Sequence, residues 1–265
     1  MDRYLIKIGG SVITDINQEA KANVSEIKRI LNEIKSSIIN KEIIIGHGSG
    51  SFGHISAHKY KINLGLVNKD SVFGSSVTQN AAAKLHRIVI ENAIDLGMTP
   101  FSFAPSSSAV SENGIIKNWD LSAMINALEK GFIPITYGDL IIDRKQGVSI
   151  GSTEEVFRYI SNSIKPKKII IGTDVDGIFN ADPKLDKSAE LIINVNNKNI
   201  DEVLQKSSGS RKIDVTGGMK SKVMHLYNIS KETGAVCQIV NVKVKDRLRE
   251  AILGKEVIST LIKAD

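Results

Sequence analysis

The sequence predicts an α/β fold, in which a mostly parallel open sheet is covered by helices on both faces. Short apolar runs alternate along the chain with longer segments of helical periodicity. Several of the short runs are apolar at successive positions, for example Ile43-Ile44-Ile45 and Ile169-Ile170-Ile171. Successive apolar residues are typical of parallel strands buried on both faces, so helices are expected on each side of the sheet.

The first half of the chain predicts three strands and two helices. Apolar runs indicate strands at residues 4–8 and 42–45. The segment between them has isoleucine and leucine on one helical face, which predicts a helix from Ser25, as the N-cap, to about residue 39. A longer helix is expected at about 71–96, after a polar loop at 63–70, and the third strand at 99–104.

The second half continues the alternation with four strands and four helices. The expected strands are 133–136, 168–173, 235–240 and 257–262, and the expected helices are about 120–130, 154–164, 218–232 and 244–253. The polar segments 143–147, 182–188 and 194–199 are expected to be surface loops, and none resembles an interdomain linker. We therefore expect a single domain over residues 1–265, with an N-terminal lobe of about 1–165 and a C-terminal lobe of about 166–265.

Composition excludes several classes of protein. The chain has 265 residues, of which 42% are hydrophobic and 24% charged, as in a protein with a sizeable core. Its single cysteine, Cys237, cannot form an internal disulfide or a thiolate zinc site. No apolar run is as long as a membrane span, and a strand follows the N-terminus directly, so we expect a cytoplasmic protein with no membrane contact. The net charge of +6 comes from scattered lysines and only 5% of residues are aromatic, which argues against nucleic-acid binding.

Three glycine-bearing turns carry the main functional signal. They are Lys7-Ile8-Gly9-Gly10-Ser11, the segment from Gly46 to His54, and the segment from Asp214 to Lys222. Glycine lets a ligand approach the backbone closely, and the helix that follows each turn presents free N–H groups and a partial positive charge. Three such turns in one parallel sheet, two of them with lysines, predict a polyphosphate site.

The second turn also permits a different interpretation. Residues 48–53 match the dinucleotide pattern G-x-G-x-x-G, which would indicate an NAD(P)-binding dehydrogenase. That pattern requires an acidic residue about 20 positions further on, at the end of the next strand. The nearest one, Asp70, lies in a polar loop before a helix, so the fingerprint is incomplete. Neither a Walker A sequence nor the protein-kinase motifs are present.

Four segments together resemble the amino acid kinase family, whose members transfer the γ-phosphoryl group of ATP to carboxylates, phosphates or phosphonates. They are Lys7-x-Gly9-Gly10-Ser11, Gly48-x-Gly50, Thr173-Asp174-Val175-Asp176-Gly177-Ile178 and Asp214-Val215-Thr216-Gly217-Gly218-Met219. The resemblance implies a three-layer α/β/α sandwich with a mostly parallel open sheet, ATP and Mg²⁺ as cofactors, and a homodimer. It also implies that the N-terminal lobe binds the acceptor and the C-terminal lobe the nucleotide.

The resemblance assigns the ATP site. Lys7 is expected to bridge the transferred phosphoryl group, because a lysine at the end of a buried strand is costly unless it meets an anion. Lys222, with Lys220 as a second candidate, is expected to reach the β- and γ-phosphates. No protein side chain is expected to ligate a metal directly, since Mg²⁺ is held mainly by ATP. The expected ATP-binding residues are Lys7, Gly9, Gly10, Ser11, Thr173, Asp174, Asp176, Gly177, Phe179, Asp182, Lys184, Gly217, Gly218, Lys220 and Lys222.

The acceptor turn narrows the substrate. Gly50-Ser51-Phe52-Gly53-His54 most resembles the branch of the family that phosphorylates isopentenyl phosphate, in which a histidine at the place of His54 binds the acceptor phosphate. Fosfomycin kinases have a comparable turn, so a phosphonate acceptor is an alternative. Catalysis is expected to rest on Lys7, His54 and Lys222. The expected acceptor site comprises Gly48, Ser49, Gly50, Gly53, His54, Phe73, Val77, Gly138 and Glu154.

The tail of the acceptor has a weaker signal. Phe73, Val77 and Ala81 share one helix face and would either line the acceptor tail or belong to the ordinary core. Two departures from the family pattern leave a regulator without turnover as a further alternative. Ile16 replaces a lysine of the first turn, and Ser152-Thr153-Glu154-Glu155 replaces the usual Ser-Gly-Asp-Asp. Glu154 is expected to orient Lys7.

Overall fold

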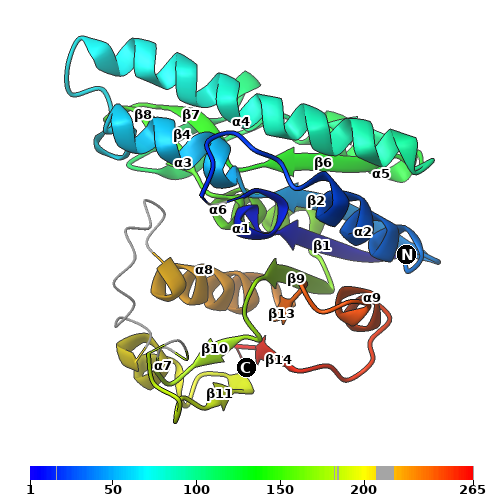
Figure 1. Cartoon of the computed structure of the whole chain (residues 1–265). Coiled ribbons are helices and arrows are strands. Elements are labelled where there is room, and N and C mark those ends of the chain that lie inside the picture. The colour runs from blue at the N-terminus through cyan, green and yellow to red at the C-terminus, as the bar shows by residue number, and fades with distance from the viewer. Residues whose placement is uncertain (16, 182, 184, 207–217, 265) are drawn as a thin grey trace.

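The computed structural model describes the whole chain except residues 16, 182, 184, 207–217 and 265. An eight-stranded sheet runs through the middle of the molecule in the order β12-β14-β13-β9-β1-β2-β6-β3 (Figure 1). All neighbouring strands are parallel except β13 and β14. The predicted α/β fold with a mostly parallel sheet is therefore confirmed. The strands are β1 Asp2–Ile8, β2 Lys41–His47, β3 Pro100–Ser102, β6 Ile133–Tyr137, β9 Lys168–Thr173, β12 Asn194–Val195, β13 Val236–Asn241 and β14 Ser259–Ile262.

Helices cover both faces of this sheet. One core contains Ile6 and the helices α2 Val24–Lys35, α4 Asp70–Asp95 and α9 Arg247–Ile252. The opposite core contains Leu5 and the helices α5 Ser122–Glu129, α6 Thr153–Ile164, α7 Ile200–Lys206 and α8 Gly218–Thr233. Because successive side chains of a strand point to opposite faces, neighbouring residues such as Leu5 and Ile6 enter different cores. This alternation produces the three layers.

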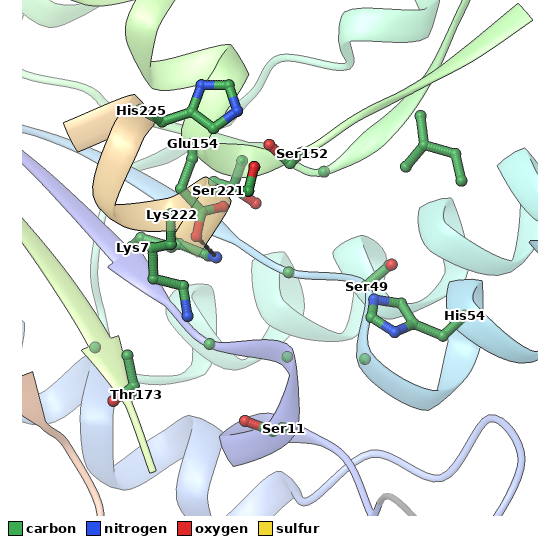
Figure 2. A pocket seen from close by; sticks show the side chains of 18 of the residues that line it. Lys7, Ser11, Ser49, His54, Ser152, Glu154, Thr173, Ser221, Lys222 and His225 are labelled. Carbon is green, nitrogen blue, oxygen red and sulfur yellow. Dashed lines mark hydrogen bonds and ion pairs between the residues drawn. The ribbon is translucent and has the colours of Figure 1, made fainter. Parts of the chain in front are cut away.

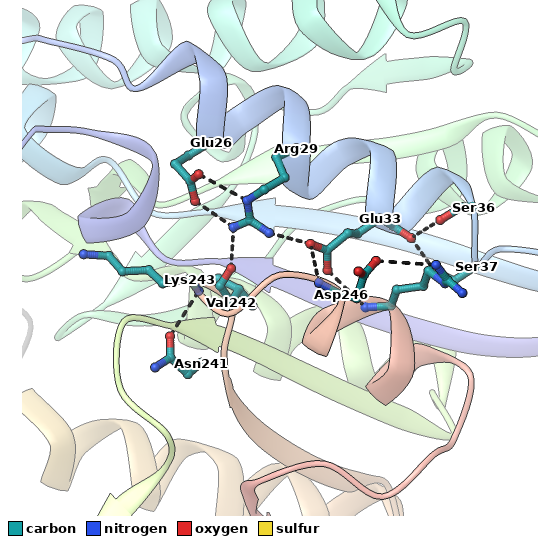
Figure 3. Close-up of polar contacts among 10 residues, drawn as sticks. Glu26, Arg29, Glu33, Ser36, Ser37, Asn241, Val242, Lys243 and Asp246 are labelled. Atoms are coloured by element: carbon teal, nitrogen blue, oxygen red, sulfur yellow. Dashed lines mark hydrogen bonds and ion pairs between the residues drawn. The ribbon is translucent and has the colours of Figure 1, made fainter.

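Two helix starts differ from the sequence prediction. Helix α2 has Asn23 as its N-cap, which accepts a hydrogen bond from Glu26 N at 3.3 Å, so the assignment of Ser25 was wrong. Helix α9 begins at Arg247 rather than at 244, because Asp246 has φ +64° and cannot continue a right-handed helix. The buried Glu33 carboxylate of α2 accepts the N–H groups of Asp246 (3.0 Å) and Arg249 (3.3 Å), and so caps α9 from another helix (Figure 3).

Several short elements escaped prediction. A second sheet, in the order β5-β4-β7-β8, lies beside α3 Gly50–Lys59 and the start of α4 (Figure 1). Its strands are β4 Val110–Glu112, β5 Ile115–Asn118, β7 Asp139–Asp143 and β8 Gly147–Gly151. The expected loop at 143–147 is the connection between β7 and β8. Three residues or fewer also make up β10 Ile178–Phe179, β11 Leu191–Ile192, η1 Ile62–Leu64 and η2 Pro105–Ser107, and α1 Gly10–Ile13 has four.

Within the described part of the chain, no helix combines the length and apolar character needed to cross a membrane. Strands β1 and β9 pair directly, so the large sheet continues through both predicted lobes. The division into lobes at about residue 165 stays a prediction.

Candidate active site

A cavity opens at the carboxyl ends of β1, β2 and β9, where parallel strands of an open α/β sheet bind ligands. It brings together two of the predicted glycine turns, the end of β9, the start of α6 and the first turns of α8 (Figure 2). Its lining residues are Lys7, Gly9, Gly10, Ser11, Gly48, Ser49, Gly50, His54, Gly138, Ile150, Gly151, Ser152, Thr153, Glu154, Gly172, Thr173, Asp174, Ser221, Lys222 and His225.

The first two glycine turns pack backbone against backbone. A Cβ atom on Gly10 would lie 2.4 Å from the nitrogen of Gly50, and one on Gly48 would lie 2.9 Å from the nitrogen of Gly10. Gly50 also has φ +47°, in the left-handed region that favours glycine. Only glycine therefore allows the two turns to approach so closely. Residues of both turns consequently border one cavity from two sides.

Lys7 and Glu154 form a buried ion pair in the lining of the cavity. The Nζ atom of Lys7 lies 2.6 Å from Oε1 of Glu154, and the two side chains are 11% and 8% exposed. Burial alone would favour the neutral carboxyl group. The positive charges of Lys7 and Lys222 outweigh it and hold the pKa of Glu154 well below its usual range. In Figure 2 these three side chains gather on one side of the cavity, with His54 and Ser49 on the other.

The turn after β9, which the family resemblance assigns to the nucleotide, divides into two parts. Thr173 and Asp174 line the cavity, and Ser11 Oγ donates a hydrogen bond of 3.4 Å to Asp174. Asp176 pairs instead with the Arg247 guanidinium and accepts a hydrogen bond from Asn241 Nδ2 at 3.1 Å. Asp176, Gly177, Phe179 and the exposed Lys220 lie outside the cavity lining. Asp182, Lys184 and Gly217, together with Ile16, lie outside the described residues, and Gly218 begins α8.

A second, smaller cavity continues from the His54 end of the first. The two share Ser49, His54, Gly138 and Ile150. The remaining lining residues of the second cavity are Gly53, Ala57, Thr78, Ala82, Asp139 and Leu140, which are mostly small or apolar. This composition suits a short hydrocarbon group attached to an anion.

The predicted face of α4 does not meet this cavity. Phe73 is 65% exposed and packs edge-on against Tyr60, with ring centroids 6.2 Å apart. Val77 is half-buried, and neither residue lines either cavity. The helix instead presents Thr78 and Ala82, one position further round. Thr78 and Ala82 have small side chains, so they do not stand out in the sequence as candidates for lining an apolar site.

The model of the amino acid kinase family matches residues 2–241. The chain belongs to this family.

Several members of the family are similar over almost the whole chain. The isopentenyl phosphate kinase of Methanothermobacter thermautotrophicus is 33% identical over 265 residues, which cover 97% of this chain and 98% of the relative. That of Thermoplasma acidophilum is 30% identical and covers 98% of this chain and 99% of the relative. A solved structure of an isopentenyl phosphate kinase superposes with a TM-score of 0.85 at 30% identity, covering 98% of this chain and all of the other.

Family membership removes the support for a dinucleotide site on Gly48–Gly53. Asp70, which that interpretation requires near the ribose, begins α4 and lines neither cavity. Gly48 and Gly50 also pack against Gly10 of the first glycine turn of this amino acid kinase, rather than facing an open crevice.

The unusual Thr-Glu-Glu sequence of this amino acid kinase has clear structural partners. Thr153 Oγ1 donates to the carbonyl of His47 at 2.8 Å, which ties α6 to the acceptor turn. Glu155 accepts from Ile116 N at 2.8 Å and pairs with Arg158 at 2.7 Å, so it holds α6 against β5. Glu154 thus lines the cavity, and Glu155 supports the packing of α6.

Sequence reasoning missed Ser221 and His225, which line the cavity from α8. His225 lies one helical turn beyond Lys222, and its Nδ1 atom is 3.9 Å from Glu155. The spacing i, i+3 from a predicted phosphate-binding lysine is a signal that could have found it.

The described residues contain no group of three or more His, Cys, Asp and Glu side chains arranged for a metal ion. Glu154 is engaged by Lys7, which leaves Asp174, beside Ser11, as the remaining carboxylate among the described lining residues. This donor set fits Mg²⁺ bound chiefly through nucleotide phosphates, which requires few protein ligands.

Proposed function

We propose that this amino acid kinase transfers the γ-phosphoryl group of ATP to isopentenyl phosphate, yielding isopentenyl diphosphate and ADP. The observation that carries the proposal is the junction of two glycine turns in one cavity that continues into a small, largely apolar one. A phosphate with a short hydrocarbon tail matches this arrangement, with the phosphate at the glycine turns and the tail in the smaller cavity. The similar isopentenyl phosphate kinases support the same acceptor.

Phosphoryl transfer depends mainly on positioning and on neutralising charge that spreads over oxygens. Lys7 bridges the transferred group, oriented by Glu154, and Lys222 contacts the β- and γ-phosphates from α8. The N–H groups of the first turn hold the triphosphate, and His54 with the acceptor turn holds the acceptor phosphate. An acceptor oxygen attacks the γ-phosphorus in line as the bond to the ADP oxygen breaks, so no phosphoenzyme forms.

Mg²⁺ would neutralise the β- and γ-phosphate oxygens, with Asp174 as the described carboxylate closest to such a role. The remaining predicted ATP-binding residues, and the predicted acceptor residues other than Phe73 and Val77, keep the roles that the family resemblance gives them. A cytoplasmic homodimer is part of the same proposal.

The hydrocarbon tail supplies part of the acceptor's binding energy. Burying five carbons at about 0.8 kcal/mol each would contribute roughly 4 kcal/mol. A compact polar acceptor would gain much less from the residues Ala57, Ala82 and Leu140.

The experiment is phosphorus NMR of the purified protein with Mg-ATP and isopentenyl phosphate. We expect the monoester signal to be replaced by two coupled diphosphate signals, in step with formation of ADP. Fosfomycin in a parallel tube tests the alternative acceptor, and its exclusive phosphorylation would refute the proposal. Thermal unfolding completes the test, because Mg-ATP should raise Tm by binding the native state and NADH should not.

A further inference from the structure

Two buried histidines join the acceptor turn to the edge of the large sheet. His47 ends β2 and is fully buried, and His86, on α4, is 5% exposed. His47 Nε2 lies 3.0 Å from His86 Nδ1. At the two ends, His47 Nδ1 lies 3.0 Å from the carbonyl oxygen of Gly48, and His86 Nε2 lies 2.7 Å from Ser102 Oγ. Both rings stack on Tyr137, with centroids 5.5 Å and 4.3 Å away.

The chemistry of the four groups fixes the direction of this chain. The Gly48 carbonyl can only accept, so His47 Nδ1 carries a hydrogen. Burial lowers the pKa of His47 to about 4, so near neutral pH its Nε2 has no hydrogen and accepts from His86 Nδ1. Burial also lowers the pKa of His86, and its Nε2 consequently accepts from the Ser102 hydroxyl. Both rings are therefore Nδ1–H tautomers.

This chain of hydrogen bonds determines how the peptide unit between Gly48 and Ser49 faces the cavity. In a trans peptide the carbonyl of Gly48 and the N–H of Ser49 point in opposite directions. His47 holds the carbonyl edge, and Ser49 lines both cavities. Among the described residues none accepts a hydrogen bond from the Ser49 N–H. The preceding peptide is also held, because His47 O accepts from Thr153 Oγ1 at 2.8 Å and from Gly138 N at 2.9 Å.

We propose that His47 and His86 are positioning residues, which hold the Gly48–Ser49 peptide so that the Ser49 N–H donates to the acceptor phosphate. This inference rests on the proposed phosphate acceptor and adds a device that orients it. Without the chain, rotation of the peptide would turn the Gly48 carbonyl oxygen toward the phosphate and repel it. Neither ring needs to touch the substrate.

Two variants at residue 86 test the proposal in the full chain. His86→Phe keeps an aromatic ring against Tyr137 and removes the donor, whereas His86→Asn places an amide N–H near the position of Nδ1. We expect His86→Phe to raise the KM for isopentenyl phosphate about tenfold or more, the usual effect of losing a hydrogen bond to a charged group. The KM for ATP should change less than twofold, and His86→Asn should recover most of the loss.

A matched control separates positioning from packing. Gln238→Leu removes another buried polar group, whose Nε2 in β13 donates to Ser259 Oγ in β14 at 2.8 Å, and should leave the acceptor KM unchanged. If His86→Phe raised both KM values equally, or changed only Tm, the inference would be overturned.

A measurement on the unmodified protein keeps the test independent of variant folding. Nitrogen-15 NMR of the imidazole rings should show Nδ1–H tautomers for His47 and His86 at pH 7, and an Nε2–H tautomer at either would refute the chain. Adding isopentenyl phosphate should shift the Ser49 amide proton downfield. Inorganic phosphate serves as a second probe. If inorganic phosphate shifts the Ser49 amide proton but the protein does not phosphorylate isopentenyl phosphate, the proposed substrate is refuted and the positioning role of His47 and His86 is retained.

Discussion

The ammonium group of Lys7 lies 2.6 Å from the carboxylate of Glu154, although 147 residues separate them in the sequence. Lys7 leaves the end of β1 and Glu154 stands in the first turn of α6, whose N-cap is Ser152. The glutamate, one methylene longer than the family's usual aspartate, reaches the lysine directly. The pair fixes the position of the positive charge that the transferred phosphoryl group would meet.

Breaking this pair from one side should cost stability as well as activity. Lys7→Met leaves the Glu154 carboxylate buried without its partner, which typically costs about 3–5 kcal/mol. The double variant Lys7→Met/Glu154→Gln should regain much of that free energy of unfolding, because no buried charge remains unpaired. Both variants should lose a hundredfold or more in kcat. Urea denaturation and steady-state kinetics measure the two effects, and a double variant as unstable as the single one would contradict the interpretation.

His54 should bind the acceptor phosphate, since it borders both cavities from the first turns of α3. Losing one preorganised charge partner removes on the order of 3 kcal/mol of transition-state stabilisation, so His54→Ala should lower kcat/KM for isopentenyl phosphate about a hundredfold. His58, one turn further along α3 and outside both cavity linings, is the matched control, and His58→Ala should retain activity. A loss below threefold for His54→Ala would refute its role.

The acceptor tail should be sensitive to Ala82 and insensitive to Phe73. Ala82→Leu would fill the second cavity and should raise the KM for isopentenyl phosphate about tenfold, the equivalent of 1.4 kcal/mol, with the KM for ATP unchanged. Phe73→Ala alters an exposed ring that packs on Tyr60 and should leave both constants within twofold. A larger increase in this KM for Phe73→Ala than for Ala82→Leu would indicate that the tail binds at the Phe73 face of α4.

The contact between the two glycine turns should be intolerant of a methyl group. In Gly10→Ala the new Cβ would meet backbone atoms of Gly50 at 2.4 and 2.7 Å, which no side-chain rotation relieves. We expect a loss of about 1–3 kcal/mol in the free energy of unfolding and higher KM values for both substrates. Gly131→Ala serves as a control for added bulk at a glycine, since a Cβ there meets no heavy atom of the described residues within 4 Å beyond its two chain neighbours, although its φ of +83° adds local strain. Equal kinetic effects of the two substitutions would contradict the close approach.

The two buried histidines should make the protein less stable as the pH falls from about 6.5 toward 4. In the unfolded chain each ring binds a proton below its ordinary pKa of about 6.5. In the folded protein burial lowers the pKa of His47 to about 4 and that of His86 further. The unfolded state therefore binds more protons in this range, and each ring removes up to about 1.4 kcal/mol of stability per pH unit.

Urea denaturation between pH 7 and 5 measures this slope, and His86→Asn should reduce it by about half. Asp139, whose pKa burial raises, acts in the opposite direction and is common to both proteins. Identical slopes for the two proteins would show that His86 is not neutral in the native state.

Much of the fold and the centre of the site could be predicted from local sequence. The strands β1, β2 and β9 were predicted from short apolar runs, and the turns after β1 and β2 were predicted from their glycines. The second sheet was missed because β4 and β5 are only three and four residues long, although they pair with each other across Asn113-Gly114, a typical hairpin turn. The pairing of β4 with β7 joins distant segments and has no local signal. The face of α4 that meets the second cavity was missed because packing against α3 and β7 decides which small residues are turned inward.

The sequence by itself determined the candidates for the chemistry: the lysine near the end of the first strand, the glycines that let two turns touch, and the histidine that follows the second glycine turn. These signals are local, because a strand-to-helix turn needs particular residues at adjacent positions. Only the tertiary structure decided what each of them meets. Lys7 pairs with Glu154, His47 and His86 bond to each other and to Gly48, and Thr78 and Ala82 line the second cavity. Long-range packing of the sheet and the helices sets these contacts, and no local spacing in the sequence indicates them.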